Sequence, residues 1–126
     1  VPPQKIRKVY GAAKIYETYV GTKKFEPNDL VFEKIRELGN EYGATTGRPR
    51  QCNWLDIDNL VKACRINGVT DLVVSKMDIL RELNTWCLYH LGQRVTLNSE
   101  FSMKHYILTH LDSDITVHWS DNPQSI

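Results

Sequence analysis

The sequence has 126 residues, 41% of them hydrophobic, which suits about one domain with a core of its own. Its 16 basic and 15 acidic residues give a formal net charge of +1. This balance excludes the bulk attraction to nucleic acid or to an acidic membrane surface that a strongly basic chain has. We therefore expect no nucleic-acid partner. The sequence also has no signal-peptide pattern and no apolar run of membrane-spanning length, so no membrane-spanning segment is expected.

The first predicted element is an amphipathic helix from residue 2 to about Val20. Two prolines at its start suit a helix entrance. The apolar residues that recur at helical spacing are Ile6, Val9, Tyr10, Ala13 and Tyr16. Gly21 ends this helix, and residues 22–27 are predicted to form a loop.

Two further helices are predicted on either side of a longer loop. Asn28 is expected to cap the first, which ends before Gly39. Asp56 is expected to cap the second, which stops at Asn67 and Gly68. The inward faces comprise Val31, Ile35 and Leu38 in the first helix, and Ile57, Leu60, Val61 and Cys64 in the second.

The second half of the chain is predicted to alternate strands with one helix. Its elements are a buried strand at 71–76, a hairpin of strands 85–91 and 94–97 around Gly92 and Gln93, a helix at 102–111 with Met103, Ile107 and Leu111 inward, and a strand at 115–119. This order, helices first and then a small mixed sheet, predicts the α/β class with α+β character. A sheet that continues into a missing part of the protein would have an open edge here.

Residues 43–56, GATTGRPRQCNWLD, are predicted to form a shaped loop because glycines and a proline interrupt them. Arg48 and Arg50 lie two apart, and in an extended segment such residues point to the same side. Two guanidinium groups on one side suit a carboxylate or a phosphate, to which Thr45 and Thr46 can add hydroxyl donors. The alternative is that both arginines are surface residues paired with nearby acids.

The cysteines and histidines predict no metal site. Cys52, Cys64 and Cys87 are widely spaced and form no CxxC pair, which favours reduced thiols in a cytosolic protein. Of the four histidines, His105 and His110 share one predicted helix. Because they are five residues apart, they lie on different faces, and a solvated role is expected for both.

The run E-Y-G-A-T-T-G-R-P-R-x-C-x-W-L-D at residues 41–56 resembles the signature of the adenylosuccinate synthetase family. Residues 9–21 resemble the family's helix into a valine-glycine turn, and residues 66–80 resemble its strand with a T-K-x-D-x-L element. Residues 115–126 resemble its final strand and nucleotide loop more loosely. The resemblance implies that residues 1–126 are the C-terminal, substrate- and nucleotide-binding part of a larger P-loop-like mixed α/β ligase.

The N-terminal phosphate-loop half of such a ligase is expected to be absent, because no G-x-x-x-x-G-K-[ST] run occurs and both ends of the chain look cut. In the family, a nucleoside triphosphate phosphorylates the 6-oxygen of IMP, and the amine of L-aspartate then displaces phosphate. The family's catalytic Asp and His belong to the absent half, so this chain alone is expected to be inactive. A non-catalytic nucleotide-binding module descended from such an enzyme is the alternative.

The resemblance also implies the ligand residues. Those for aspartate are Ala44, Thr45, Thr46, Gly47, Arg48, Pro49 and Arg50; those for IMP are Val20 and Arg48; those for the triphosphate are Arg50, Lys76, Met77, Asp78, Val117, His118 and Trp119. Val20 could equally be a core valine at the end of a helix. The implied cofactor is Mg²⁺ with GTP or ATP, with the magnesium site in the absent half. The complete enzyme is expected to be a cytoplasmic homodimer.

Lys76 and Asp78 follow a predicted strand, where α/β sheets place ligands. A carboxylate can accept two N–H bonds from guanine while a lysine stem covers the ring, although a surface ion pair is the alternative. Trp119 and Ser120 replace the family's Gly-Pro at the guanine ring, and Asn122 replaces an arginine. We therefore predict relaxed or ATP-leaning use, as in a phage-type relative that acts on dGMP. A Trp119 pointing into the core would instead leave the GTP preference intact.

Overall fold

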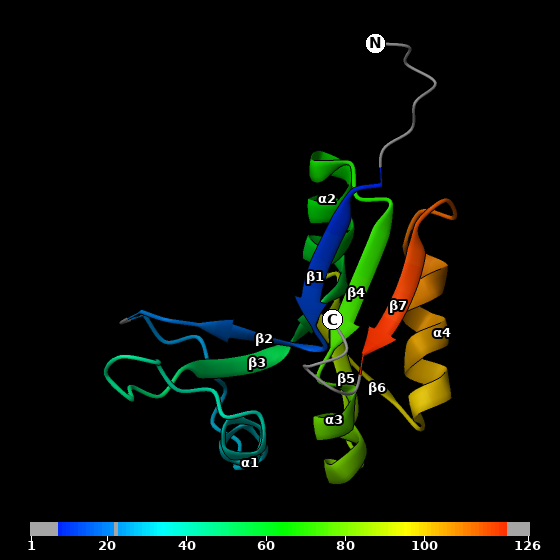
Figure 1. The fold of residues 1–126 in the computed structure, drawn as a ribbon. Helices are drawn as coiled ribbons and strands as arrows, with labels where there is room; N and C mark the ends of the chain where they lie inside the picture. Colours follow the sequence, from blue (N-terminus) through cyan, green and yellow to red (C-terminus); the bar gives the residue numbers. More distant parts are fainter. Residues whose placement is uncertain (1–7, 22, 121–126) are drawn as a thin grey trace.

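The computed structural model describes residues 8–21 and 23–120 and has a mixed α/β fold, as the sequence predicts (Figure 1). Its elements in chain order are β1 (Tyr10–Lys14), β2 (Tyr16–Tyr19), α1 (Val31–Leu38), β3 (Gln51–Asp56), α2 (Ile57–Asn67), β4 (Asp71–Ser75), α3 (Met77–Leu83), β5 (Trp86–His90), β6 (Gln93–Leu97), α4 (Glu100–His110) and β7 (Thr116–Ser120). None of the helices in these residues is long and apolar enough to cross a membrane.

The strands form two sheets. One is parallel with the order β1-β4-β7, and the other is mixed with the order β2-β3-β5-β6. The three parallel strands end at one edge, where the register sets Lys14, Ser75 and Ser120 side by side. Open parallel sheets bind ligands outside the carboxyl ends of their strands, so this edge is where a site is expected.

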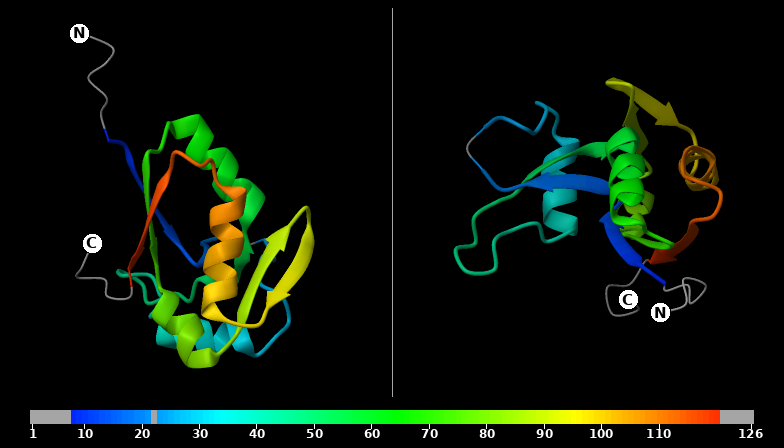
Figure 2. Two further views of the ribbon diagram at one scale, coloured as in Figure 1. Left: turned by 90° about the vertical axis from the view of Figure 1, so that its right-hand side faces the viewer. Right: turned by 90° about the horizontal axis from the view of Figure 1, so that it is seen from above.

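The layers share one core. Helices α2 and α4 lie on one face of the parallel sheet, and the β5–β6 hairpin lies on their far side (Figure 2). Leu72 of β4, Leu88 of β5 and Ile107 of α4 are buried where these layers meet. The strands β2 and β3 extend with α1 to one side as an arm, and the loop of residues 43–50 projects from its end (Figure 1).

The helix predicted from residue 2 to Val20 is wrong over its described residues, which form β1 and β2. The apolar residues do recur at helical spacing, but the segment is rich in β-branched and aromatic residues, and β4 offers a partner strand. Ile15, which lies off the predicted helical stripe, is fully buried between the two strands. The described chain thus begins with strands, contrary to the expected order. The prolines and Ile6 lie outside the described residues.

Two other predictions need correction. Only residues 43–50 form a loop, because residues 51–56 are the strand β3, which buries Cys52 and Trp54. The short helix α3 after Lys76 was not predicted. It follows the strand directly, with Lys76 in the left-handed region at φ 71°, so the sequence offers no conventional start signal.

The remaining elements are confirmed within one or two residues. Asp56 caps α2 by accepting hydrogen bonds from the backbone N–H groups of Asp58 and Asn59, and Gly68 ends it at φ 62°. The β5–β6 hairpin turns at Leu91 and Gly92, one residue earlier than predicted.

Helix α1 is also confirmed, but its predicted details differ. Asp29, rather than Asn28, accepts a hydrogen bond from the N–H of Val31. The residues it buries are Phe32 and Ile35, whereas Leu38 is exposed.

Candidate functional site

The loop of residues 43–50, called the arginine loop below, is an exposed turn closed by its own backbone. The N–H of Gly43 donates to the carbonyl of Arg48 at 2.8 Å, and the N–H of Gly47 donates to the carbonyl of Gly43 at 2.9 Å. Gly47 has φ 68°, which glycine adopts without strain. The exposed residues of the loop are Ala44, Thr45, Thr46, Gly47, Arg48 and Pro49.

The two arginines differ in their surroundings. Arg48 is exposed, and its guanidinium has no acidic partner among the described residues. Arg50 is half-buried, and its Nη1 lies 3.1 Å from Oε1 of Glu41. The backbone N–H of Arg50 also donates to the carbonyl of Glu41 at 3.0 Å. The surface alternative thus matches the exposure of Arg48 and the acidic partner of Arg50, but that partner, Glu41, is a buried residue that is 1% exposed. The ligand roles of both arginines stay predictions.

Glu41 connects the base of the arginine loop to the start of the chain. Its Oε1 accepts from Nζ of Lys14 at 2.8 Å, and its Oε2 accepts from the hydroxyl of Tyr16 at 2.6 Å. Burial disfavours the charged carboxylate, but the bonds from Lys14, Tyr16 and Arg50 outweigh it and lower the pKa of Glu41. Burial and the bond to Glu41 raise the pKa of Tyr16, which keeps its hydroxyl as a donor.

Lys76 and Asp78, which are predicted to bind the base and are called the base-reading element below, lie near the turn of residues 39–41 that precedes the arginine loop. Nζ of Lys76 donates to the carbonyl of Gly39 at 3.4 Å, two residues before Glu41. Asp78 is half-exposed in the first turn of α3, and its carboxylate has no partner among the described residues. Met77 between them is fully buried. The fold therefore brings Lys76 and the base of the arginine loop to one turn, although 26 residues separate Arg50 from Lys76 in sequence.

Of the residues predicted on β7, His118 and Trp119 border one cavity of about 530 Å³ at the parallel sheet, and Val117 does not line it. Neighbouring strand residues point to opposite faces, so His118 lies on the other face from Val117 and Trp119. Nε2 of His118 lies 3.1 Å from Oδ1 of Asp71, and this bond lowers the pKa of Asp71. Trp119 is partly buried against the core, with Nζ of Lys104 at 5.2 Å from its ring centroid.

The interpretation of Val20 as a core valine at the end of a helix is wrong. Val20 follows β2 and is 69% exposed, so it is neither at the end of a helix nor in the core. Its role at a purine monophosphate stays a prediction. Asn122 lies outside the described residues.

A pocket of about 410 Å³ adjoins the arginine loop. It is lined by Lys24, Glu26, Arg36, Pro49, Arg50 and Gln51. Arg36 engages both carboxylate oxygens of Glu26, while the side-chain oxygen of Gln51 accepts from the N–H groups of Phe25 and Glu26. Gln51, the first residue of β3, thus joins residues 25 and 26 to that strand.

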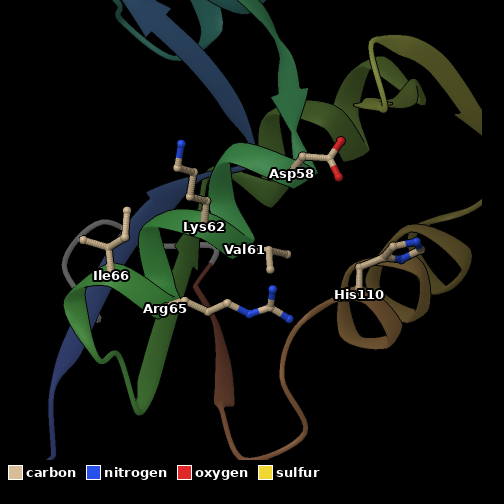
Figure 3. Close-up of a pocket in the computed structure, with 6 residues that line it drawn as sticks. All are labelled: Asp58, Val61, Lys62, Arg65, Ile66 and His110. Atoms are coloured by element: carbon tan, nitrogen blue, oxygen red, sulfur yellow. The ribbon is translucent and has the colours of Figure 1, made fainter.

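A second pocket, of about 320 Å³, lies between α2 and α4 and contains none of the predicted site residues (Figure 3). In its wall Arg65 is bound by Asp112 at 2.8 Å. His110 is half-buried rather than solvated, and its ring stacks on Tyr106 with centroids 4.4 Å apart. Within residues 8–21 and 23–120, no group of three His, Cys, Asp or Glu side chains is placed to hold a metal ion. The three cysteines are buried and free.

The parallel sheet with helices on one face defines the chain as a mixed α/β protein, and the family model of adenylosuccinate synthetase matches residues 1–113. The adenylosuccinate synthetase of Cytophaga hutchinsonii is 47% identical over 97 residues, or 73% of this chain and 22% of that protein. The enzyme of Thermodesulfovibrio yellowstonii is 51% identical over 82 residues, or 64% of this chain and 19% of that protein. The chain belongs to the adenylosuccinate synthetase family and spans about a fifth of these curated relatives.

A solved structure shows the same fold. It is the fully ligated adenylosuccinate synthetase of Plasmodium falciparum, with a TM-score of 0.77 and 25% identity. The match covers 98% of this chain and 39% of that one.

Sequence reasoning missed Lys14, Tyr16 and Glu41. Glu41 carried a usable signal, since it begins the E-Y-G-A-T-T-G-R-P-R run and is an acid beside an arginine-rich loop. Lys14 and Tyr16 carried none, because they were placed on a helix that does not form.

Proposed function

We propose that this chain is the C-terminal, substrate- and nucleotide-binding part of a purine-biosynthetic ligase that joins L-aspartate to the 6-position of IMP. Its family membership, with an arginine loop whose Arg50 is held on a buried carboxylate, is the observation that carries the proposal. The homologues are named as adenylosuccinate synthetases, which supports ligase chemistry in the complete protein.

In this proposal the arginine loop binds aspartate. Arg48 and Arg50 engage its carboxylates, and the exposed hydroxyls of Thr45 and Thr46 and the backbone N–H groups around Gly47 add donors. Attack by the amine of aspartate builds negative charge, which cations that are already fixed in place stabilise without reorganising. Arg48, together with Val20, also contacts the purine monophosphate.

The triphosphate is assigned to the carboxyl ends of β4 and β7. Asp78 has a carboxylate available to a base, Lys76 supplies a stem to cover the ring, and Arg50 contacts the triphosphate as well. Mg²⁺ on the triphosphate would supply charge neutralisation, and the described residues offer no cluster to hold it. The complete enzyme is proposed to be a cytoplasmic homodimer, and the three buried free thiols of this chain are in keeping with a reducing compartment.

The isolated 126-residue chain should release no phosphate in an aspartate-dependent manner, because the half that carries the phosphate loop and the catalytic Asp and His is proposed to lie outside these 126 residues. The measurement is phosphate release with IMP or dGMP, GTP or ATP, magnesium and aspartate. Adding back a phosphate-loop half, or expressing any longer gene product, should restore it. Turnover by the isolated chain would contradict the proposed division. An unrelated domain encoded upstream of these residues in the gene would favour the non-catalytic nucleotide-binding module. A preference for dGMP over IMP would favour the phage-type ligase.

Competition between GTP and ATP at equal concentration tests the base-reading role of Asp78. Trp119 is partly buried against the core and Lys104 and also lines a cavity with His118, and its core contact supports the interpretation in which the indole leaves the guanine site unchanged. We expect GTP to be preferred by the complete ligase, and Asp78→Asn to lower that preference roughly tenfold or more, as loss of a charge-assisted bond predicts. Glu82→Gln, on the same helix, is the control. Equal use of both nucleotides would favour the ATP-leaning alternative.

A further inference from the structure

We infer that Glu41 is a positioning residue, whose buried carboxylate fixes the guanidinium of Arg50 and so sets the affinity of the site for the amino-acid substrate. The inference rests on the proposed function, in which Arg50 binds aspartate. Glu41 lies two residues before the arginine loop and is not part of it. Its side chain is 1% exposed, so it does not itself contact a ligand.

The partners of Glu41 leave its carboxylate a single orientation. Oε2 is held by the hydroxyl of Tyr16 at 2.6 Å, and Oε1 accepts from both Lys14 at 2.8 Å and Arg50 at 3.1 Å. The main chain is fixed as well, since the N–H of Arg50 donates to the carbonyl of Glu41 at 3.0 Å. The carboxylate therefore cannot turn without losing a bond to a buried or charged partner.

Arg50 keeps capacity for a ligand while it is held. A guanidinium has five N–H donors, and among the described residues Arg50 gives only Nη1, to Glu41. The side chains of Lys14 and Arg50 are 32% and 31% exposed, whereas that of Glu41 is 1% exposed. Two cations around one anion leave a net positive charge on the outer side of the cluster. An anionic ligand thus meets the cations, and Glu41 supports them from within.

The chain around Glu41 is shaped for this arrangement. A Cβ at Gly39 would overlap the hydroxyl of Tyr16 and lie 3.3 Å from Oε2 of Glu41, so the bond between these two side chains requires glycine there. The carbonyl of the same Gly39 accepts from Lys76. The turn that holds Arg50 is thus also tied to the base-reading element.

A double-mutant cycle in the complete ligase tests the inference, with the KM for L-aspartate and kcat measured for Glu41→Gln, Arg50→Leu and the double variant. Glu41→Gln keeps the shape but removes the charge, so we expect KM to rise about tenfold, the effect of one charge-assisted bond, with a smaller change in kcat. Because Glu41 acts through Arg50, the double variant should be no worse than Arg50→Leu alone. Asp112→Asn, another carboxylate paired with an arginine, is the control and should match the parent enzyme.

The outcomes separate the inference from the proposed function. If Arg50→Leu raises KM while Glu41→Gln does not, or if the two effects multiply, Glu41 does not act through Arg50 and the inference is overturned. If Arg50→Leu leaves KM unchanged, the aspartate role of the loop is itself wrong. Should Glu41→Gln fail to fold, Tyr16→Phe keeps the ring and removes only the bond to Oε2. It is expected to raise KM by about threefold, again without adding to Arg50→Leu.

Discussion

Replacing Arg50 with leucine in the complete ligase is expected to raise the KM for L-aspartate by roughly ten- to a hundredfold, because a carboxylate of the substrate loses a charge-assisted partner. Arg48→Leu should weaken aspartate use to a similar extent. The two variants should differ in their second effect: Arg48→Leu should also raise the KM of the purine monophosphate, and Arg50→Leu that of the triphosphate. The measurement is a set of initial-rate series in which each substrate is varied in turn.

The control for these variants is Arg65→Leu, which removes an exposed arginine that is bound by Asp112 outside the site. It should leave all three KM values unchanged. Folding should be less disturbed in Arg48→Leu than in Arg50→Leu, since only Arg50 has a buried partner that would lose a cation. Unchanged aspartate kinetics in both loop variants would make these arginines ordinary surface residues.

Replacing Phe32 with alanine is expected to lower the free energy of unfolding of the 126-residue chain by about 3–5 kcal/mol. Phe32 is 1% exposed, and its ring lies 4.8 Å from that of Trp54, centroid to centroid. The pair joins α1 to β3, so the cavity left by alanine would lie in the core of the arm. Urea unfolding followed by tryptophan fluorescence measures the loss.

Phe101→Ala is the matched control, because Phe101 lies on α4 but is 79% exposed. Its substitution should change the free energy of unfolding by no more than about 0.5 kcal/mol. A change of no more than about 0.5 kcal/mol in Phe32→Ala as well would show that Phe32 is not a core residue of the folded chain.

Local sequence signals by themselves determined several elements and the family. Helix α2 is specified by Asp56 at its start and Gly68 at its end, both of which act within a few residues. The hairpin of β5 and β6 is likewise specified by a turn between two short apolar runs. The arginine loop was identified from a contiguous run, and the family was recognised from the same residues.

Only the tertiary structure decided which distant segments pair and pack against each other. Residues 10–14 form a strand because β4, about 60 residues later, pairs with them, and this pairing overrides the helical spacing of the apolar residues. The orientation of Trp119 depends in the same way on α4, which supplies Lys104.

Glu41 depends on tertiary contacts most of all. Its partners Lys14 and Tyr16 lie 27 and 25 residues away in the sequence. They are on β1 and β2, where the sequence pattern predicted a helix instead. A charge buried without partners is unstable, so Glu41 can be buried only once the fold brings Lys14, Tyr16 and Arg50 around it. The sequence therefore named the residues that are proposed to meet a ligand, and the long-range pairing of strands decided that Glu41 is the residue on which Arg50 is held.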